Sequence, residues 1–282
     1  MLQSTLQKPF SISGIGVHSG KNFSITVRPA DEDFGIKFKR TDINEIFDAN
    51  FLKVKNATMC TQLINESGNS LKTIEHLMAA LYALKISNAL IEVSGEEIPI
   101  LDGSAYPYIC EISKVGTFEQ SEPRKVLRVL KEVSVSEGAK RETFSPSDDF
   151  TIDVECDFSA KGLKTSPVHY NMNHGMFEME VASARTFGFV DEMEFLQKNR
   201  LALGASLENA VGYDNQGNPV NPEGLRFDNE SATHKLLDAI GDLSLSGYWF
   251  LGKFSAFCPS HHLNNMLLRE LFSNEENYEI VA

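Results

Sequence analysis

Three side chains that can bind a metal ion recur at regular spacing between Thr233 and Gly247. His234, Asp238 and Asp242 are each four residues apart, and at about 100° per residue they form one stripe along a helix. The opposite side of this helix is apolar and would pack into a core: Leu236, Leu237, Ile240 and Leu243. The polar stripe can bind a divalent cation, or it can be the solvated face of an ordinary amphipathic helix.

A second helix, predicted over Thr73 to Leu84, begins with Glu75 and His76. Two adjacent side chains are poorly placed to bind the same metal ion, but they can have different roles at one metal site. The imidazole then serves as the ligand and the carboxylate as the base for a water, as in the H-E-x-x-H pattern of zinc hydrolases. The two helices together therefore predict a hydrolytic metal site.

The spacing on the first helix separates its two carboxylates. His234 and Asp238 are one turn apart, about 6 Å along the axis, so both can reach one ion at about 2.0–2.2 Å. Asp242 lies two turns from His234, about 12 Å away, which is too far for both to bind the same metal. We therefore expect Asp242 to act behind the metal ligands.

The charge balance and the absence of long apolar runs limit the classes of function. The chain has 282 residues, with 26 basic and 39 acidic side chains and a net charge of −13. This balance argues against nonspecific nucleic-acid binding, which needs Lys and Arg on phosphates. The sequence contains no run of about 18 apolar residues and no signal peptide pattern, so we expect a soluble, cytoplasmic protein. Four widely spaced cysteines without a C-x-x-C pair predict free, buried thiols.

The predicted elements follow one order twice, which indicates an α+β fold of two similar domains. Each half has short strands, then a helix with candidate ligands, then a strand and a last helix. We expect residues 1–122 and 123–282 to form two sheet-plus-helix layered domains, with the active site in the cleft between them. Residues 5–42 are predicted to form antiparallel strands, beginning with TLQKPFSISGIGV, and a less regular segment follows to about residue 66.

The second half has an insert at about residues 178–222, predicted as strand, helix, strand and a polar turn. It carries more large apolar side chains than a small excursion can bury within itself: Phe187, Phe189, Phe195, Leu196, Leu201 and Leu203. The insert can pack on the parent sheet, or it can form an apolar passage for a lipid chain.

Seven motifs together resemble the zinc-dependent UDP-3-O-acyl-N-acetylglucosamine deacetylase family of lipid A synthesis. They occur in the family's order over nearly the whole chain: GIGVHSGK (14–21), TIEHLMAAL (73–81), EIPILDGSA (97–105), SARTFGF (183–189), GLRFDNE (224–230), HKLLDAIGDL (234–243) and SHHLNN (260–265). Any one of them is unspecific, but the ordered combination is highly specific. The resemblance implies two α+β domains, a cleft between them, and an insert that builds the acyl passage.

Carried over residue by residue, the resemblance implies the metal site and the catalytic groups. His76, His234 and Asp238 would bind Zn²⁺ in an open catalytic site of three protein ligands, and Fe²⁺ could occupy the same set. Glu75 would be the general base that activates the attacking water, and His261 the general acid that protonates the departing amine.

The resemblance also implies residues that support the reaction and bind the substrate. Asp242 would hydrogen-bond His261, Thr186 would stabilise the oxyanion, and Lys235 would contact the diphosphate or the sugar. Four further side chains are candidates for contact with the substrate: His18, Phe158, Phe187 and Phe189. His18 can equally be a local hydrogen-bonding residue of its Gly-rich turn, and Phe158 can be a core residue.

The implied activity is hydrolysis of the acetamide of a UDP-3-O-(3-hydroxyacyl)-N-acetylglucosamine, with release of acetate. We expect a monomer that binds this UDP-linked substrate, with neither a nucleic-acid partner nor a transmembrane segment. Two alternatives remain. Another zinc amidase could use the same Glu-His and His-x3-Asp groups, and the two domains could form a sheet-and-helix RNA-binding module, which the acidic charge disfavours.

Overall fold

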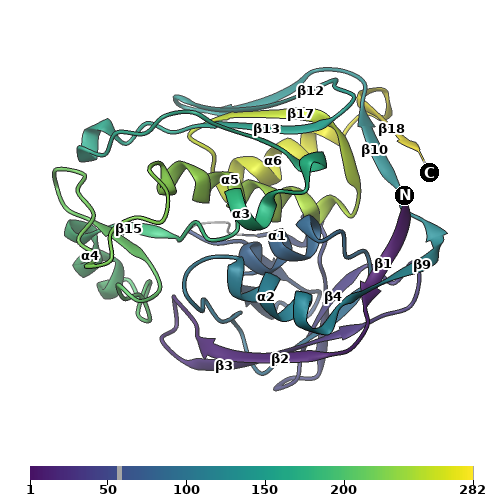
Figure 1. Cartoon of the computed structure of the whole chain (residues 1–282), viewed down its shortest axis with the longest axis horizontal. Helices are drawn as coiled ribbons and strands as arrows, with labels where there is room; N and C mark the ends of the chain where they lie inside the picture. The colour runs from purple at the N-terminus through teal and green to yellow at the C-terminus, as the bar shows by residue number, and fades with distance from the viewer. Residues whose placement is uncertain (56–58, 282) are drawn as a thin grey trace.

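Two β-sheets lie on the outside of the molecule and helices fill the space between them (Figure 1). This computed structural model describes residues 1–55 and 59–281. The first half contains β1 (Leu2–Leu6), β2 (Phe10–Ile15), β3 (Asn22–Pro29), β4 (Ile36–Arg40), β5 (Glu45–Asp48), β6 (Gln62–Ile64), β7 (Ser70–Lys72), α1 (Glu75–Ala83), β8 (Ala89–Val93), α2 (Tyr106–Val115) and β9 (Thr117–Pro123).

The second half repeats this order and carries the insert. Its strands are β10 (Val126–Val129), β11 (Val133–Glu137), β12 (Lys140–Ser145), β13 (Phe150–Glu155), β14 (Val168–Asn171), β15 (Phe187–Phe189), β16 (Val211–Tyr213), β17 (Trp249–Phe257) and β18 (Tyr278–Val281). Its helices are α3 (Phe177–Glu180), α4 (Met193–Lys198), α5 (Glu230–Leu243) and α6 (His261–Leu271). The predicted α+β fold class is confirmed.

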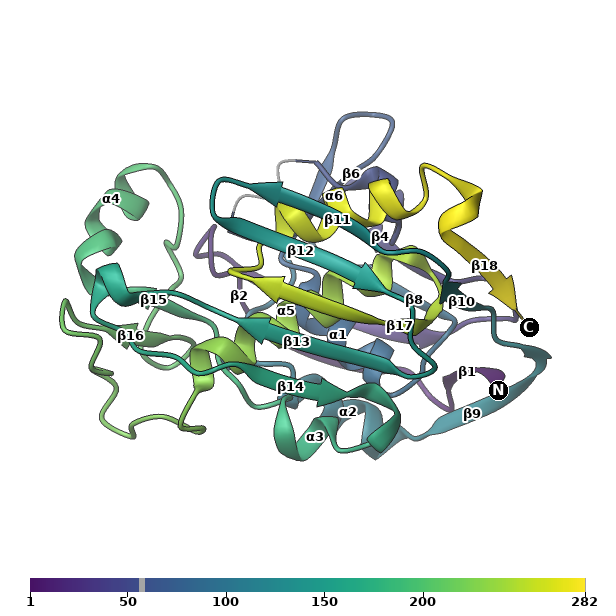
Figure 2. The same cartoon turned by 90° about the horizontal axis from the view of Figure 1, so that it is seen from above.

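The two main sheets share one topology. The strand order is β2-β3-β8-β4-β5 in the first and β11-β12-β17-β13-β14 within the second. In each, the strand that follows the ligand-bearing helix is central, antiparallel to one neighbour and parallel to the other. Figure 2 shows these strands of the second sheet side by side, with β10 and β18 beyond them. The internal repeat is thus clearer in the strand pairing than in the sequence.

Two details of the sequence prediction are wrong. The run TLQKPFSISGIGV contains two strands in different sheets: β1 pairs with β9, and β2 pairs with β3. Pro9 lies between them and cannot donate a hydrogen bond within a strand, which explains the break. The segment expected to be irregular, up to about residue 66, contains β5 and then β6, which forms a hairpin with β7.

Alternating and helical patterns explain why the sheets and helices pack as they do. In β3, every second side chain is buried: Phe23, Ile25 and Val27. The apolar side of α5 is buried as predicted, but its polar side is buried as well, because it packs against α1 and faces the cavity described below. His234, Asp238 and Asp242 are therefore not part of a solvated helix face, and that alternative is wrong.

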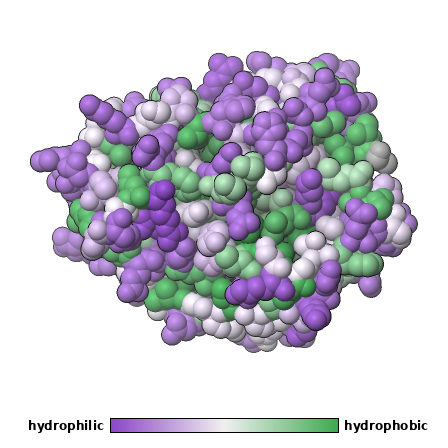
Figure 3. Space-filling view, in the orientation of Figure 1, coloured by the Kyte–Doolittle hydropathy of each residue, from purple (hydrophilic) through white to green (hydrophobic). Residues whose placement is uncertain are grey.

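One face of the molecule carries mainly polar side chains (Figure 3). Figure 3 shows polar and charged residues over most of one face, with hydrophobic residues in patches between them. Among the residues that the structure describes, no helix is long and apolar enough to cross a membrane.

The division into two domains at residues 122 and 123 is our proposal. β9 still pairs with β1, whereas β10, which begins at Val126, belongs to the second sheet. The change of sheet therefore falls close to the expected boundary.

A glycine allows the closest approach between α1 and α5. A Cβ at Gly241 would overlap the main-chain carbonyl oxygen of Glu75. Alanine normally stabilises a helix by about 1 kcal/mol relative to glycine, but overpacking costs about 1–3 kcal/mol. We expect Gly241→Ala to lower the free energy of unfolding in denaturant titrations. Gly188→Ala, where a Cβ would meet nothing within 4 Å, should not. Equal stability of both variants would contradict a tight contact.

Candidate metal centre and active site

A cavity of about 670 Å³ is lined by residues of both halves. Every site residue predicted from the sequence lines it except Asp242: His18, Glu75, His76, Phe158, Thr186, Phe187, Phe189, His234, Lys235, Asp238 and His261. The chain thus brings side chains from distant parts of the sequence around one space, at the start of α1, in the middle of α5 and just beyond the end of β17.

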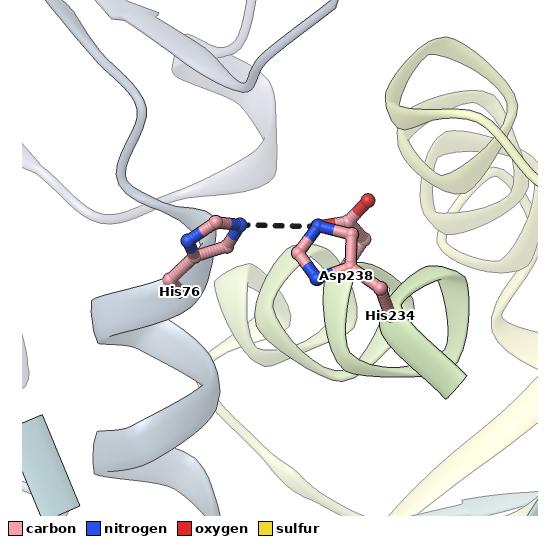
Figure 4. A group of neighbouring side chains, drawn as sticks. All are labelled: His76, His234 and Asp238. Atoms are coloured by element: carbon pink, nitrogen blue, oxygen red, sulfur yellow. Dashed lines mark ion pairs between the residues drawn. The ribbon is translucent and has the colours of Figure 1, made fainter. Parts of the chain in front are cut away.

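His76, His234 and Asp238 form the candidate metal-binding group (Figure 4). Their possible ligand atoms all lie within 4.8 Å of one another. Nε2 of His76 is 3.5 Å and Nε2 of His234 is 3.3 Å from Oδ1 of Asp238. Ligand atoms of a tetrahedral zinc site, with bonds of about 2.0–2.1 Å, are about 3.3–3.4 Å apart, so these spacings fit one ion.

The hydrogen bonds of His234 and Asp238 engage one polar atom of each side chain and leave the atom that could bind a metal free. Nδ1 of His234 donates to the carbonyl oxygen of Ala184 at 3.0 Å, and burial lowers the pKa of His234 to about 3. Its ring is therefore neutral, with a lone pair on Nε2. Lys235 donates to Oδ2 of Asp238 at 2.8 Å, while the buried Oδ1 has no hydrogen-bond partner among the residues that the structure describes. An orphaned carboxylate oxygen between two imidazole nitrogens is what a metal ion would satisfy.

Glu75 lies beside the metal group in a fully buried position. Its Oε2 accepts a hydrogen bond from the backbone N–H of Thr61 at 3.1 Å, and its Oε1 is 4.0 Å from Nε2 of His261. Burial raises the pKa of Glu75, and the nearby His261 and His76 only partly offset this effect. A carboxylate with a raised pKa is suited to accept and release a proton near neutral pH.

His261 faces the metal group from the start of α6, and Asp242 lies behind it. Nδ1 of His261 donates to Oδ2 of Asp242 at 2.7 Å, and its Nε2 is 3.9 Å from Oδ2 of Asp238. Burial acts to lower the pKa of His261, but the charge and hydrogen bond of Asp242 outweigh it and raise the pKa to about 9. His261 is therefore protonated at neutral pH and holds a proton on Nε2, toward the cavity.

Two residues that the sequence analysis did not single out complete the surroundings of Asp242. Asp242 accepts a hydrogen bond from the hydroxyl of Thr61, and another from Nδ2 of Asn264 at 2.7 Å. Asn264 is three residues after His261 and so lies on the same side of α6, a spacing that could have indicated it. Thr61 lies in the segment predicted to be irregular, where no periodic pattern points to a hydroxyl.

Two buried charged side chains hold the loops around the site. Glu97 accepts hydrogen bonds from the backbone N–H groups of His18 at 2.7 Å and Ser19 at 2.9 Å. Arg185 is ion-paired with Glu230 of α5 at 2.8 Å. It lies between Ala184, which holds His234, and Thr186. The motifs around Glu97 and Arg185 therefore include residues that position the site rather than line it.

The apolar end of the cavity is built by the insert. Phe187 and Phe189 line it and pack against Phe158, with ring centroids 5.4 and 6.2 Å from that of Phe158. Leu196 also lines the cavity, whereas Phe195, 69% exposed, and Leu203 face solvent. Part of the apolar set thus lines the cavity, and part of it lies at the surface.

A buried group of two histidines and an aspartate, next to a carboxylate and a protonated histidine, is the arrangement of a metal-assisted hydrolase. The family model for UDP-3-O-acyl N-acetylglycosamine deacetylase matches residues 3–273. The UDP-3-O-acyl-N-acetylglucosamine deacetylase of Psychrobacter sp. (strain PRwf-1) is 43% identical, covering 100% of this chain and 96% of the relative. That of Histophilus somni (strain 129Pt) is 42% identical, covering 99% and 93%. The chain belongs to this deacetylase family.

The two aspartates of α5 should differ in their effect on metal content. Asp238→Ala removes the orphaned oxygen between the two imidazoles, so the purified variant should lose most of its metal. Asp242→Asn leaves the three candidate ligands intact and should keep stoichiometric metal with a lower kcat. Because the pKa of His261 falls without the anionic partner, the basic limb of its pH–rate profile should move to lower pH. Elemental analysis and pH profiles check this; metal lost only from the Asp242 variant would reverse the assignment.

Proposed function

We propose that this chain catalyses the hydrolysis of the acetamide of UDP-3-O-(3-hydroxyacyl)-N-acetylglucosamine, releasing acetate, in lipid A biosynthesis. The proposal is supported most by one observation: candidate metal ligands, a buried carboxylate and a protonated histidine face one cavity with an apolar end. The full-length similarity to deacetylases with this substrate in their names supports the same reaction.

His76, His234 and Asp238 would hold the metal, Zn²⁺ by preference for this donor set, with Fe²⁺ as an alternative. Bound there, the ion would polarise the acetamide carbonyl and promote deprotonation of the attacking water. Lys235 keeps Asp238 oriented through Oδ2, and Ala184 keeps His234 in the tautomer with a free Nε2.

In this mechanism Glu75 is the general base. Its position next to the metal group puts a carboxylate with a raised pKa beside the attacking water. The backbone N–H of Thr61 fixes one of its oxygens and leaves the other to accept the proton. Burial excludes bulk water, which would otherwise compete for the carboxylate.

His261 is the general acid in the proposed mechanism. Its Nε2 proton points to the region between Glu75 and Asp238, where the amine of the substrate would depart. Asp242 holds the ring and favours its charged form. Proton donation from Nε2 to the departing nitrogen completes the cleavage of the C–N bond.

Thr186 and Lys235 would both assist the reaction. Thr186 lines the cavity next to the segment that holds His234, and we assign it to the oxyanion that develops on the acetamide. Lys235 lies over the ring of Phe187, with Nζ 5.8 Å from the centroid, and would contact the sugar or its diphosphate. His18 would contact the substrate from the turn that Glu97 holds.

The apolar end would receive the acyl chain. Phe187, Phe189 and Leu196 provide a wall on which methylene groups can be buried, and Phe158 packs against it. This arrangement supports the reading of the insert as an acyl passage. We further propose that the enzyme works as a monomer in the cytoplasm, a compartment in which its four free cysteines stay reduced.

Removal of either proton-transfer group should cost turnover without loss of metal. Glu75→Ala and His261→Ala should each lower kcat on the order of 10²-fold or more. Glu75 must be deprotonated, so its loss removes the acid limb of the pH–rate profile; His261 must be protonated, so its loss removes the basic limb. His262→Ala changes the exposed neighbour of His261 and is the matched control. An unchanged pH profile in either active-site variant would contradict its role.

The acyl passage predicts that chain length controls catalytic efficiency. Each buried methylene contributes about 0.8 kcal/mol, so kcat/KM should rise roughly fourfold per added CH₂ until the passage is full. Leu196→Lys should abolish this gain and raise KM for long chains selectively. Phe195→Lys changes the preceding residue of α4, which faces solvent, and is the matched control. Equal effects of Leu196→Lys on short and long chains would mean that the insert has only a structural role.

A further inference from the structure

A second, smaller cavity lies where the two halves meet, and none of the described residues lines both it and the cavity around the candidate metal group. Its volume is about 180 Å³. The first half contributes residues of β1 and α1, including Gln3 and Tyr82, and the second half contributes Trp249 at the start of β17. Arg124, in the connection between β9 and β10, also forms part of its wall.

Arg124 carries a buried positive charge that is poorly compensated. Arg124 is only 8% exposed, and its buried Nε has no hydrogen-bond partner in residues 1–55 and 59–281. One terminal nitrogen donates to the carbonyl oxygen of Lys85. Within the described part of the chain, Arg124 forms no ion pair with a carboxylate. Because a guanidinium stays protonated, such burial is unfavourable unless an anion is nearby.

The acidic residue in the wall is already engaged with other groups. Oδ1 of Asp33 accepts a hydrogen bond from Nε2 of Gln3 at 3.0 Å and lies 3.9 Å from Nζ of Lys125. Asp33 therefore offsets the charge of Lys125 in part, and it does not pair with Arg124. The cavity retains an excess of positive charge.

Two aromatic rings line the cavity near the guanidinium of Arg124. Trp249 is stacked on Tyr82 with ring centroids 4.8 Å apart. The guanidinium carbon of Arg124 is 5.8 Å and Nζ of Lys85 is 5.7 Å from the centroid of Trp249. Two cations thus lie near one indole ring, whose face attracts cations but carries no negative charge to balance them.

We propose that this cavity binds a small oxyanion, a phosphate or a carboxylate, that accepts hydrogen bonds from Arg124. The guanidinium fork matches the oxygens of such an ion. A volume of about 180 Å³ is below the range of about 300–1,000 Å³ for sites that hold drug-sized ligands, so a nucleotide or the sugar-nucleotide substrate does not fit.

The position of the site gives the anion a structural consequence. Met78 and Tyr82 of α1 line the cavity, and so does Ser244, directly after α5. His76 lies at the start of α1, whereas Asp238 lies nearer the end of α5 that Ser244 follows. A bound anion would therefore contact both halves beside the helix pair that carries the candidate metal ligands and stabilise their packing.

The single tryptophan of the chain gives a direct assay, because Trp249 lines the cavity. Tryptophan fluorescence of the full-length protein would be titrated with inorganic phosphate and, separately, with acetate, against chloride at matched ionic strength. We expect a saturable change with at least one anion, and the responding anion identifies the phosphate or the carboxylate class. Arg124→Gln should weaken this binding roughly tenfold or more, since it removes charged hydrogen bonds. The control Arg28→Gln removes an exposed arginine that pairs with Glu92 at 2.7 Å and should bind normally.

Thermal unfolding provides a second readout. Phosphate stabilises folded proteins in general, so specific binding is measured as the difference in stabilisation between variants. Phosphate or acetate should raise the melting temperature of the wild type and Arg28→Gln more than that of Arg124→Gln. If Arg124→Gln does not fold, Arg124→Lys, which keeps the charge and loses the fork, takes its place and should bind more weakly. The proposal would be overturned if the fluorescence of the wild type showed no saturable change at anion concentrations up to about 100 mM, which is a hundredfold above a millimolar Kd. Equal binding by the wild type and the Arg124 variant would overturn it as well.

Discussion

The packing of α1 against α5 is the contact on which the rest of the site depends. His76 comes from the first half, and His234 and Asp238 come from the second, so neither half holds the candidate metal group alone. Gly241 lets the main chain of α5 meet that of α1 at Glu75. This close approach explains why ligand atoms from two helices converge within 4.8 Å. The shared topology of the two sheets supports it, because each sheet places its ligand-bearing helix on the inner side.

Such a concentration of buried charge is stable only if each group has a partner. Lys235 takes one oxygen of Asp238 and leaves the other free between two imidazoles, and Asp242 takes one nitrogen of His261 and leaves the other toward the cavity. The same division is repeated at Glu75, where Thr61 binds a single oxygen. Asp238, His261 and Glu75 are therefore each fixed through one side-chain atom and have another atom free.

Much of this arrangement could be predicted from the sequence, because apolar and polar residues recur at helical spacing in α1 and α5. His234 and Asp238 one turn apart, with Asp242 beyond reach of the same ion, followed from helix geometry alone. Thr61 could not be predicted, since its contacts with Glu75 and Asp242 depend on how a segment without periodicity crosses the helix ends. The same limit applies to the strands: β1 and β2 look continuous in sequence but belong to different sheets, because pairing partners are distant in the chain.

The most direct test of the account measures metal content and deacetylase activity on the same samples. Prolonged chelation, verified by elemental analysis, would be followed by addition of zinc in increasing ratios, with acetate release from UDP-3-O-acyl-N-acetylglucosamine as the readout. If His76, His234 and Asp238 hold one catalytic ion, activity should disappear with the metal and return fully at about one equivalent, since the donor set is that of a single three-ligand site. Full activity in protein shown to be free of metal would contradict the account.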